Sequence, residues 1–146
     1  MFQRDAFSLS TARDRLRAII CKTETPNPTP LDISPWVAMA LLQKAIRRGR
    51  EGLALRAAAT LLAAAPEKLW RRCGGIAFED VGLADLETVS LVVAALGGKR
   101  FRAALGGEWP VASYIVTRMA RDRGAVGRKF HLSQSDEWWA RQGLNL

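Results

Sequence analysis

Two adjacent carboxylates, Glu79 and Asp80, are the first candidates for chemistry in this chain of 146 residues. Neighbouring carboxylates can transfer protons as general acid and base, or hold a metal ion. Three cations, Lys68, Arg71 and Arg72, lie on the preceding turns of the same predicted helix. We therefore expect the acidic pair to form structural ion pairs at a helix end rather than a catalytic centre.

Nucleophilic catalysis and nucleotide binding find little support in the sequence. The single histidine, His131, is flanked by Phe130 and Leu132 in a basic stretch, and Cys73 lies on an apolar helical stripe, which is typical of packing. A phosphate loop needs Ser or Thr after its Gly-Lys pair, but Arg100 occupies that place. Two cysteines and one histidine also make a poor metal site. We expect no enzyme activity, no metal and no cofactor.

Basic side chains are the remaining candidates for function. The chain has 22 Lys and Arg against 14 Asp and Glu, a net charge of +8, and residues 91–146 contain 9 of the cations and 4 of the acids. Arginine suits phosphate because its planar fork donates two hydrogen bonds at once. The candidate nucleic-acid-binding residues are Lys44, Arg47, Arg48, Arg71, Arg72, Lys99, Arg100, Arg102, Arg118, Arg121, Arg128 and Lys129.

The elements that must position these residues are predicted to be helices throughout. Apolar residues recur at helical spacing, capping residues or prolines stand at the starts, and glycines stand at the ends. Gly82 suits a backbone position with positive φ at the end of the helix predicted over 66–81. The sequence therefore predicts an all-α bundle of antiparallel helical hairpins, similar to a clamp-loader collar, with helices over 35–48, 51–65, 66–81, 86–96, 99–105 and 110–123, and a last short helix after Ser133.

The N-terminal part is predicted to be a short helix followed by a linker, and the sequence leaves open whether it docks on the bundle. Leu16, Ile19 and Ile20 indicate one short helix, which Ser10 or Thr11 could cap. Three prolines within residues 26–30 then exclude a helix and predict an extended linker. We expect residues 1–33 to form the helix and linker, and residues 34–146 to form the bundle.

Composition excludes several other classes of protein. Hydrophobic residues make up 49% of the chain and charged residues 25%, so the chain is not disordered throughout. The start has no apolar core of a secretion signal, and no apolar stretch approaches the roughly 20 residues that span a bilayer. We expect a cytoplasmic protein with reduced thiols and no membrane partner.

Three tryptophans carry separate expectations. Trp70, in the predicted helix over 66–81, should pack in the core. Trp138 and Trp139 are adjacent in a short helix, so they cannot both face inward. One of them is a candidate for a subunit contact or for stacking on a base.

Residues 41–85 resemble a known family. They read Leu-Leu-Gln-Lys-Ala-Ile-Arg-Arg-Gly, then an Ala-rich helix, then Leu-Trp-Arg-Arg-Cys-Gly-Gly-Ile-Ala-Phe-Glu-Asp-Val-Gly-Leu-Ala-Asp. This pattern is similar to the helical C-terminal region of the replication-associated recombination protein A (RarA/MgsA) family of clamp-loader-like AAA+ ATPases. The matching positions are Lys44, Arg47, Ala54–Leu62, Arg71, Arg72, Glu79, Asp80 and Gly82.

The resemblance implies a helical collar that holds subunits together in a machine acting at stalled replication forks. No nucleotide-binding element accompanies it in this sequence, so ATP hydrolysis is not implied. The leading hypothesis is a non-catalytic module of DNA replication, recombination or repair that forms a homo-oligomer or docks on replication or repair proteins. The alternative is direct DNA or RNA binding by the Arg-rich C-terminal third.

Overall fold

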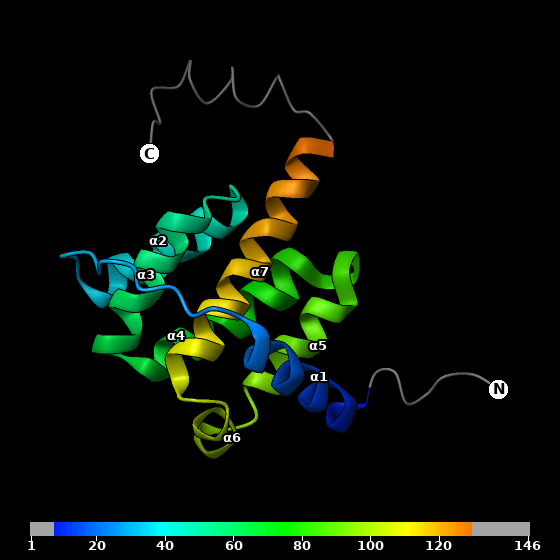
Figure 1. Ribbon diagram of the computed structural model, residues 1–146. Coiled ribbons are helices and arrows are strands. Elements are labelled where there is room, and N and C mark those ends of the chain that lie inside the picture. Colours follow the sequence, from blue (N-terminus) through cyan, green and yellow to red (C-terminus); the bar gives the residue numbers. More distant parts are fainter. Residues whose placement is uncertain (1–7, 130–146) are drawn as a thin grey trace.

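The computed structural model describes residues 8–129, with side chains described as far as Arg123. It confirms the all-α fold: every regular element in this range is a helix or a helical turn (Figure 1). In chain order the elements are α1 (Leu9–Lys22), α2 (Pro35–Arg47), α3 (Glu51–Ala64), α4 (Pro66–Ile76), the π turn η2 (Ala77–Val81), the 3₁₀ turn η3 (Gly82–Asp85), α5 (Leu86–Ala95), α6 (Lys99–Ala104) and α7 (Glu108–Lys129).

Short polar side chains fix the starts of several helices, because they accept a hydrogen bond from an otherwise unpaired backbone N–H. The side chain of Ser34 accepts from the backbone N–H of Val37, and Pro35 follows it as the first residue of α2. Asp85 caps α5 in the same way. At α1 the prediction was wrong: Ser8, rather than Ser10 or Thr11, is the cap.

The longest helix, α7, differs from its prediction at both ends. It begins at Glu108 instead of Pro110, and it continues through Gly124 to Lys129. A glycine inside a helix costs about 1 kcal/mol relative to alanine, which weakens a helix without ending it. The helix is supported by the packing of Val111, Ile115 and Met119, which are fully buried against neighbouring helices.

Three glycines lie in or just after α4, and the structure shows the surroundings of two of them and the backbone conformation of the third. A Cβ at Gly74 would lie 3.1 Å from the Leu96 side chain, whereas a Cβ at Gly75 would meet open space, so neither glycine is required by the approach of another backbone. Gly82 has φ of 50°, so its predicted positive φ is confirmed. The helix before it changes from α to π geometry at Ala77 before it ends.

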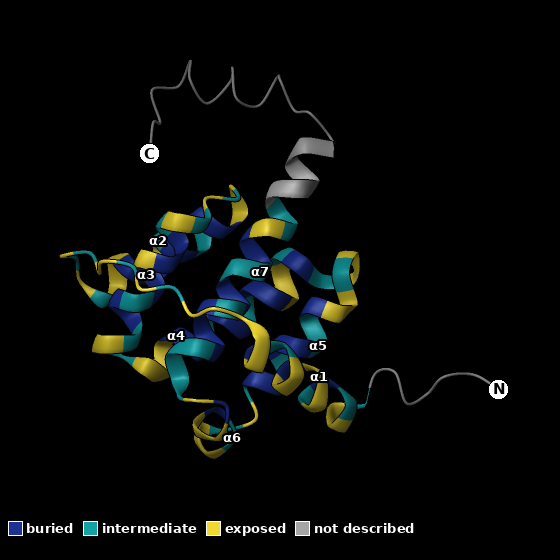
Figure 2. Cartoon of the chain, viewed as in Figure 1, coloured by how far each residue is buried: buried dark blue, intermediate teal, exposed yellow. Residues whose placement is uncertain are grey.

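One apolar core joins the whole described chain. The helix α7 passes through the middle of the bundle and has α2, α3 and α5 packed around it (Figures 1 and 2). The buried side chains of α2 and α4 recur at helical spacing, and the largest fully buried side chains include Leu42, Ile46, Leu69, Ile76 and Leu91. Within residues 8–129 no helix is long and apolar enough to cross a membrane.

The N-terminal helix and the extended segment after it pack on the bundle. Leu16 of α1 is fully buried, and α1 lies against α5. The Trp109 indole N–H donates to the carbonyl of Pro26 at 2.8 Å, and the Leu31 backbone N–H donates to Thr60 Oγ1 at 2.7 Å. The proline-rich segment is therefore bound along the body by specific hydrogen bonds.

Candidate functional site

The arginines singled out by the sequence are largely engaged inside the fold, and Arg102 is the clearest case. Its side chain is buried and donates to Glu108 Oε1 at 3.1 Å and to the Ala95 carbonyl at 2.9 Å. Its guanidinium lies 4.3 Å from the centre of the Trp70 ring, which is buried as predicted. The proposal that Arg102 contacts nucleic acid is therefore wrong for this conformation, because the guanidinium has no route to a phosphate.

The acidic pair separates into one engaged and one exposed carboxylate. Asp80 Oδ1 is 3.0 Å from the Nε of Arg47, and Gln43 also donates to Asp80. Arg72 reaches the same network indirectly, since it donates to the side-chain carbonyl of Gln43 at 2.9 Å. Asp80 thus forms the expected structural ion pair, although its partner is Arg47 of α2 rather than a cation of α4. Glu79 is exposed and makes no ion pair within the described residues.

A second polar cluster, which local sequence patterns do not reveal, lies between η3, α5 and α7. The hydroxyl oxygen of Thr88 is 2.6 Å from Asp85 Oδ2, 2.7 Å from Asp122 Oδ2 and 2.8 Å from the Arg118 Nε. Arg118 also donates to Tyr114 and to Glu87. Burial lowers the pKa of Arg118, but the hydrogen bond that it donates to Tyr114 and the nearby carboxylates raise this pKa by more, so the net shift is upward.

The sequence could not identify this cluster because its members are spread over residues 85–122. Thr88 in particular sits in a Val-rich helix and has no local signal of function. Only the spacing of Tyr114, Arg118 and Asp122 at every fourth residue indicates that they share one face of α7.

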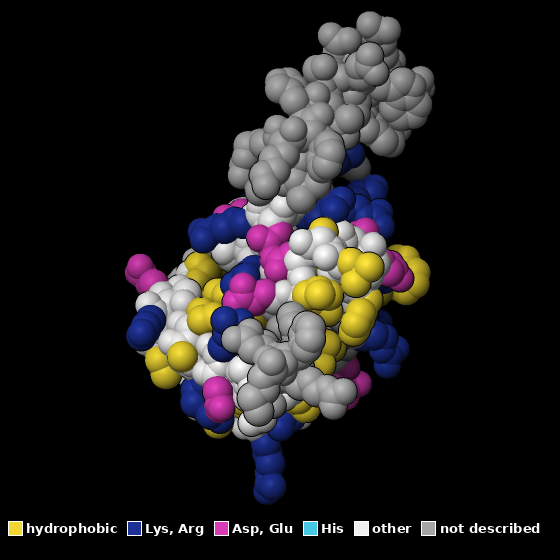
Figure 3. All heavy atoms as spheres, turned by 90° about the vertical axis from the view of Figure 1, so that its right-hand side faces the viewer, with side chains coloured by type: hydrophobic (Ala, Val, Ile, Leu, Met, Phe, Trp, Pro, Cys, Tyr) yellow, Lys and Arg dark blue, Asp and Glu magenta, His cyan; other side chains and the backbone are white. Residues whose placement is uncertain are grey.

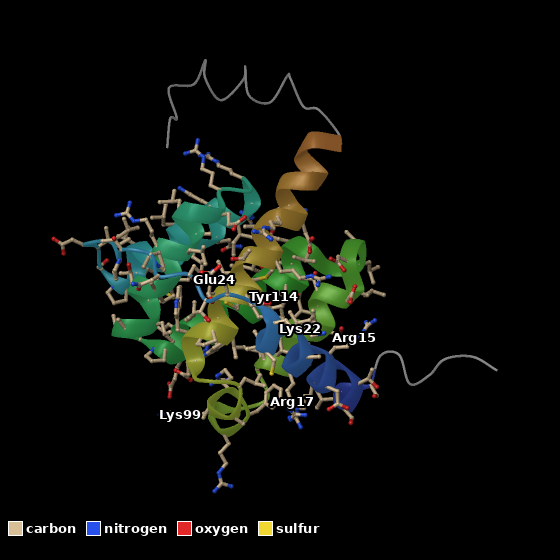
Figure 4. All side chains as sticks on the ribbon, viewed as in Figure 1. Arg15, Arg17, Lys22, Glu24, Lys99 and Tyr114 are labelled. Carbon is tan, nitrogen blue, oxygen red and sulfur yellow. The ribbon has the colours of Figure 1, made fainter. Side chains whose placement is uncertain are left out.

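A pocket of about 460 Å³ opens beside this cluster. The extended segment contributes Thr23, Glu24 and Pro26 to its wall, α3 contributes Glu51 and Leu55, and the remaining wall is the face of α7 from Ser113 to Asp122. Glu24 and Tyr114 lie close together over α7 in Figure 4. Arg121 at the rim forms two hydrogen bonds with Glu51, at 2.9 and 3.1 Å, which raise its pKa. Both arginines of the pocket are therefore neutralised by acids of the chain itself.

The candidate cations that remain exposed do not form one surface. Lys44 and Arg48 lie on and just after α2, Arg71 lies on α4, and Lys99 and Arg100 lie on α6. Figure 4 labels Lys99 on α6, at the lower edge of the described molecule. The C-terminal third therefore does not present its arginines together, as far as the structure describes it.

The structure instead places α6 beside cations of α1 that are absent from the sequence-based candidates. The guanidinium of Arg13 lies 5.3 Å from the centre of the Phe101 ring, and that of Arg17 lies 6.0 Å from it. Lys99 and Arg100 are exposed on the same short helix as Phe101, and we refer to these four cations of α1 and α6 as the α1–α6 surface. Its parts are far apart in the sequence, so no local cluster signalled it.

Apart from Leu9 of α1, the large apolar side chains that are exposed among the described residues fall into two separate groups. Phe78, Leu83 and Leu86 come from η2, η3 and the start of α5, which contact one another, and we call them the head group. Trp36 and Val37, in the first turn of α2, are the tail group. Leu83 is 89% exposed and Trp36 is 74% exposed. Figure 3 shows the side of the molecule that carries α5, where apolar side chains lie among carboxylates and cations.

The head and tail groups are held apart by α2. Arg47, in the last turn of α2, pairs with Asp80 of η2, so that end of α2 adjoins the head group. Trp36 lies 11 residues earlier, which corresponds to about 16 Å along a helix. The start of α2 and the η2–η3 corner accordingly lie on opposite sides in Figure 1.

Several predicted residues lie outside the described part of the chain. These are His131, the Trp138–Trp139 pair with its predicted short helix, and the side chains of Arg128 and Lys129. Among the described residues there is no group of three or more His, Cys, Asp or Glu that could hold a metal ion. Comparison of the chain with protein-family models, curated proteins and solved structures finds no match.

Proposed function

We propose that this chain is a non-catalytic helical module of DNA replication, recombination or repair that assembles with copies of itself, head group to tail group. The observation that carries the proposal is the pair of exposed apolar groups at the two ends of α2. The resemblance of residues 41–85 to the collar of the RarA/MgsA family supplies the biological setting, and the head group begins inside that segment. We propose a cytoplasmic location on the same grounds.

Two different surfaces on one chain favour head-to-tail contacts. If the head group covers the tail group of a second copy, each copy still presents one free head and one free tail, and a ring forms when the rotation closes. Covering Leu83 and Trp36 in this way removes large apolar side chains from water, and each fully covered side chain contributes about 1.5–3 kcal/mol.

One local charge, the carboxylate of Glu79, also favours a second copy as the occupant of the head group. Glu79 is adjacent to Phe78 and has no ion pair within the described residues, whereas the chain as a whole has a net charge of +8. A second copy therefore brings an excess of cations to this carboxylate. Repulsion between the two net charges opposes assembly, so added salt should strengthen it by screening.

The test uses two variants that each remove one surface. Leu83→Glu blocks the head group and leaves the tail group, and Trp36→Glu does the reverse. Sedimentation velocity should find oligomers for the unaltered chain, monomers for each variant alone, and a one-to-one dimer when the two variants are mixed. Ala103→Glu, at an exposed position of α6, is the matched control and should assemble normally.

The mixture distinguishes head-to-tail pairing from a general loss of self-association. Each variant lowers the net charge by one, so charge repulsion does not account for a loss of assembly. An unaltered chain that is monomeric at all concentrations would refute the proposal. Variants that assemble alone, or that fail to pair when mixed, would refute the head-to-tail arrangement.

Direct DNA or RNA binding is the second candidate function, and the α1–α6 surface is the observation that favours it. Lys99 and Arg100 are exposed on α6, and two arginines of α1 lie over Phe101 of the same helix. Fluorescence anisotropy with labelled single- and double-stranded DNA would show affinity that falls with salt, by about 0.9 log unit per log unit of salt for each neutralised phosphate of a duplex. The double variant Lys99→Glu/Arg100→Glu should abolish it, and Lys68→Glu on α4 is the control. Binding that survives the double variant would exclude this surface.

A further inference from the structure

The hydroxyl of Thr88 has more partners than its single hydrogen can serve if both nearby carboxylates are ionised. A hydroxyl offers one hydrogen and two lone pairs. Arg118 Nε donates to one lone pair at 2.8 Å, and the oxygens of Asp85 and Asp122 lie at 2.6 and 2.7 Å. Since the one hydrogen reaches only one carboxylate, the other must carry a proton and donate it to the second lone pair.

Asp122 is the residue that holds this proton. Asp85 caps α5, where its second oxygen accepts the backbone N–H of Thr88 at 3.1 Å, and a helix N-terminus favours an anion. Burial raises the pKa of Asp85, but hydrogen bonding within the cluster and the charge of Arg118 lower it by more, to about 2. Burial and the neighbouring Asp85 raise the pKa of Asp122.

The surroundings do not supply enough positive charge to ionise both carboxylates. Arg118 is the cation in contact with the cluster, and it also serves Glu87, which pairs on its other side with Arg15 of α1. Arg121 at the pocket rim is occupied by Glu51 of α3. The ionisable groups that face the cluster are Asp85 of η3, Glu87 of α5, Tyr114, Arg118 and Arg121 of α7, Glu51 of α3, Glu24 of the extended segment and, through Glu87, Arg15 of α1.

We propose that the proton shared by Asp85, Thr88 and Asp122 fastens the η3–α5 corner to α7, and that its loss as pH rises loosens this corner and weakens head-to-tail assembly. The effect on assembly rests on the function proposed above, because Asp85 is the last residue of η3 and directly precedes Leu86 of the head group. Two ionised carboxylates around one hydroxyl repel each other, so the corner separates from α7.

The direction of the pH dependence follows from the two carboxylates. The folded chain binds the Asp122 proton more tightly than the unfolded chain, so this contribution to stability is complete below the ordinary pKa of 3.8 and is lost as pH rises through the higher folded-state value. The contribution of Asp85 is complete above 3.8 and is lost as pH falls towards 2. The corner is therefore most stable between these two transitions.

The first test measures the proton directly in the full chain. Carbon-13 NMR of the aspartate carboxyl groups should show that Asp122 titrates above pH 3.8 and that Asp85 titrates below it. Asp122→Asn supplies a permanent N–H donor to Thr88. In urea unfolding, the free energy of unfolding of the unaltered chain should fall as pH rises through the Asp122 transition, whereas that of the variant should not. Asp14→Asn, at an exposed position of α1, is the matched control. An Asp122 that titrates at or below 3.8 would overturn the proposal.

The second test concerns assembly. Sedimentation velocity should show that oligomers of the unaltered chain dissociate as pH rises through the Asp122 transition and that Asp122→Asn oligomers do not. If the titration is as expected but the chain is always monomeric, the proposed function is refuted, whereas the role of the shared proton in fastening the η3–α5 corner to α7 is supported. If oligomers form with no difference between the two chains, the link between the proton and assembly is overturned.

Discussion

Replacing Arg102 by alanine is expected to destabilise the fold severely, although nothing in the sequence separates this residue from its exposed neighbours. Arg102 is 8% exposed, and it connects α6 to the start of α7 and to the end of α5. The variant loses a salt bridge of 3.1 Å to Glu108, a hydrogen bond of 2.9 Å to the Ala95 carbonyl and the contact with the Trp70 ring.

The magnitude follows from the groups that are left without partners. Glu108 keeps its charge with a side chain that is only 22% exposed, and the Ala95 carbonyl stays buried. Breaking a buried pair by removing one partner costs about 3–5 kcal/mol, because the remaining charge is uncompensated. The partial exposure of Glu108 places the expected loss near the lower end, at about 3 kcal/mol.

Urea denaturation followed by tryptophan fluorescence measures this loss. The exposed Arg100 provides the matched control, and Arg100→Ala should change the free energy of unfolding by less than about 0.5 kcal/mol. The double variant Arg102→Met/Glu108→Leu removes both charges and should recover much of the loss. A loss below about 1 kcal/mol for Arg102→Ala would refute the assignment of this arginine to the core.

Three further outcomes are expected from local contacts. Gly75→Ala should stabilise the chain by about 0.5–1 kcal/mol in thermal unfolding, because a Cβ at this position meets open space. Gly74→Ala should stabilise it less, because its Cβ would lie 3.1 Å from a leucine methyl. Equal stabilisation by the two variants would contradict this reasoning. Burial raises the pKa of Cys73 to about 12. A thiol reagent at pH 8 should therefore modify only the exposed Cys21 in the folded chain. Modification of both cysteines would contradict the structure. Trp109→Phe removes the 2.8 Å hydrogen bond to the extended segment and should cost about 1 kcal/mol, with faster proteolysis within residues 23–31. Unchanged proteolysis would show that this bond does not hold the segment.

Helix positions could be predicted from the sequence because their signals are local. The cap at Ser34, the proline after it and the spacing of Met39, Leu42 and Ile46 lie within one short segment, and a helix satisfies its backbone hydrogen bonds within itself. The same local rules failed at Gly124, because a single glycine weakens a helix without ending it.

The role of each charged residue was decided by tertiary structure. Arg100 and Arg102 are two residues apart in the sequence, yet one is exposed and the other is buried against Trp70, because the face of a helix that becomes buried depends on what packs against it. The Asp85, Thr88 and Asp122 cluster joins residues more than 30 positions apart, and no local pattern specifies such a contact.

The sequence by itself determined an all-α chain with a basic charge and no recognisable catalytic set, since composition and periodicity are properties of the chain alone. Only the tertiary structure decided which arginines form ion pairs with acids of the chain and which apolar side chains stay exposed beside the two ends of α2. It also decided which two carboxylates lie within hydrogen-bonding distance of the Thr88 hydroxyl. These outcomes depend on distances between segments, and such distances exist only after the helices have packed.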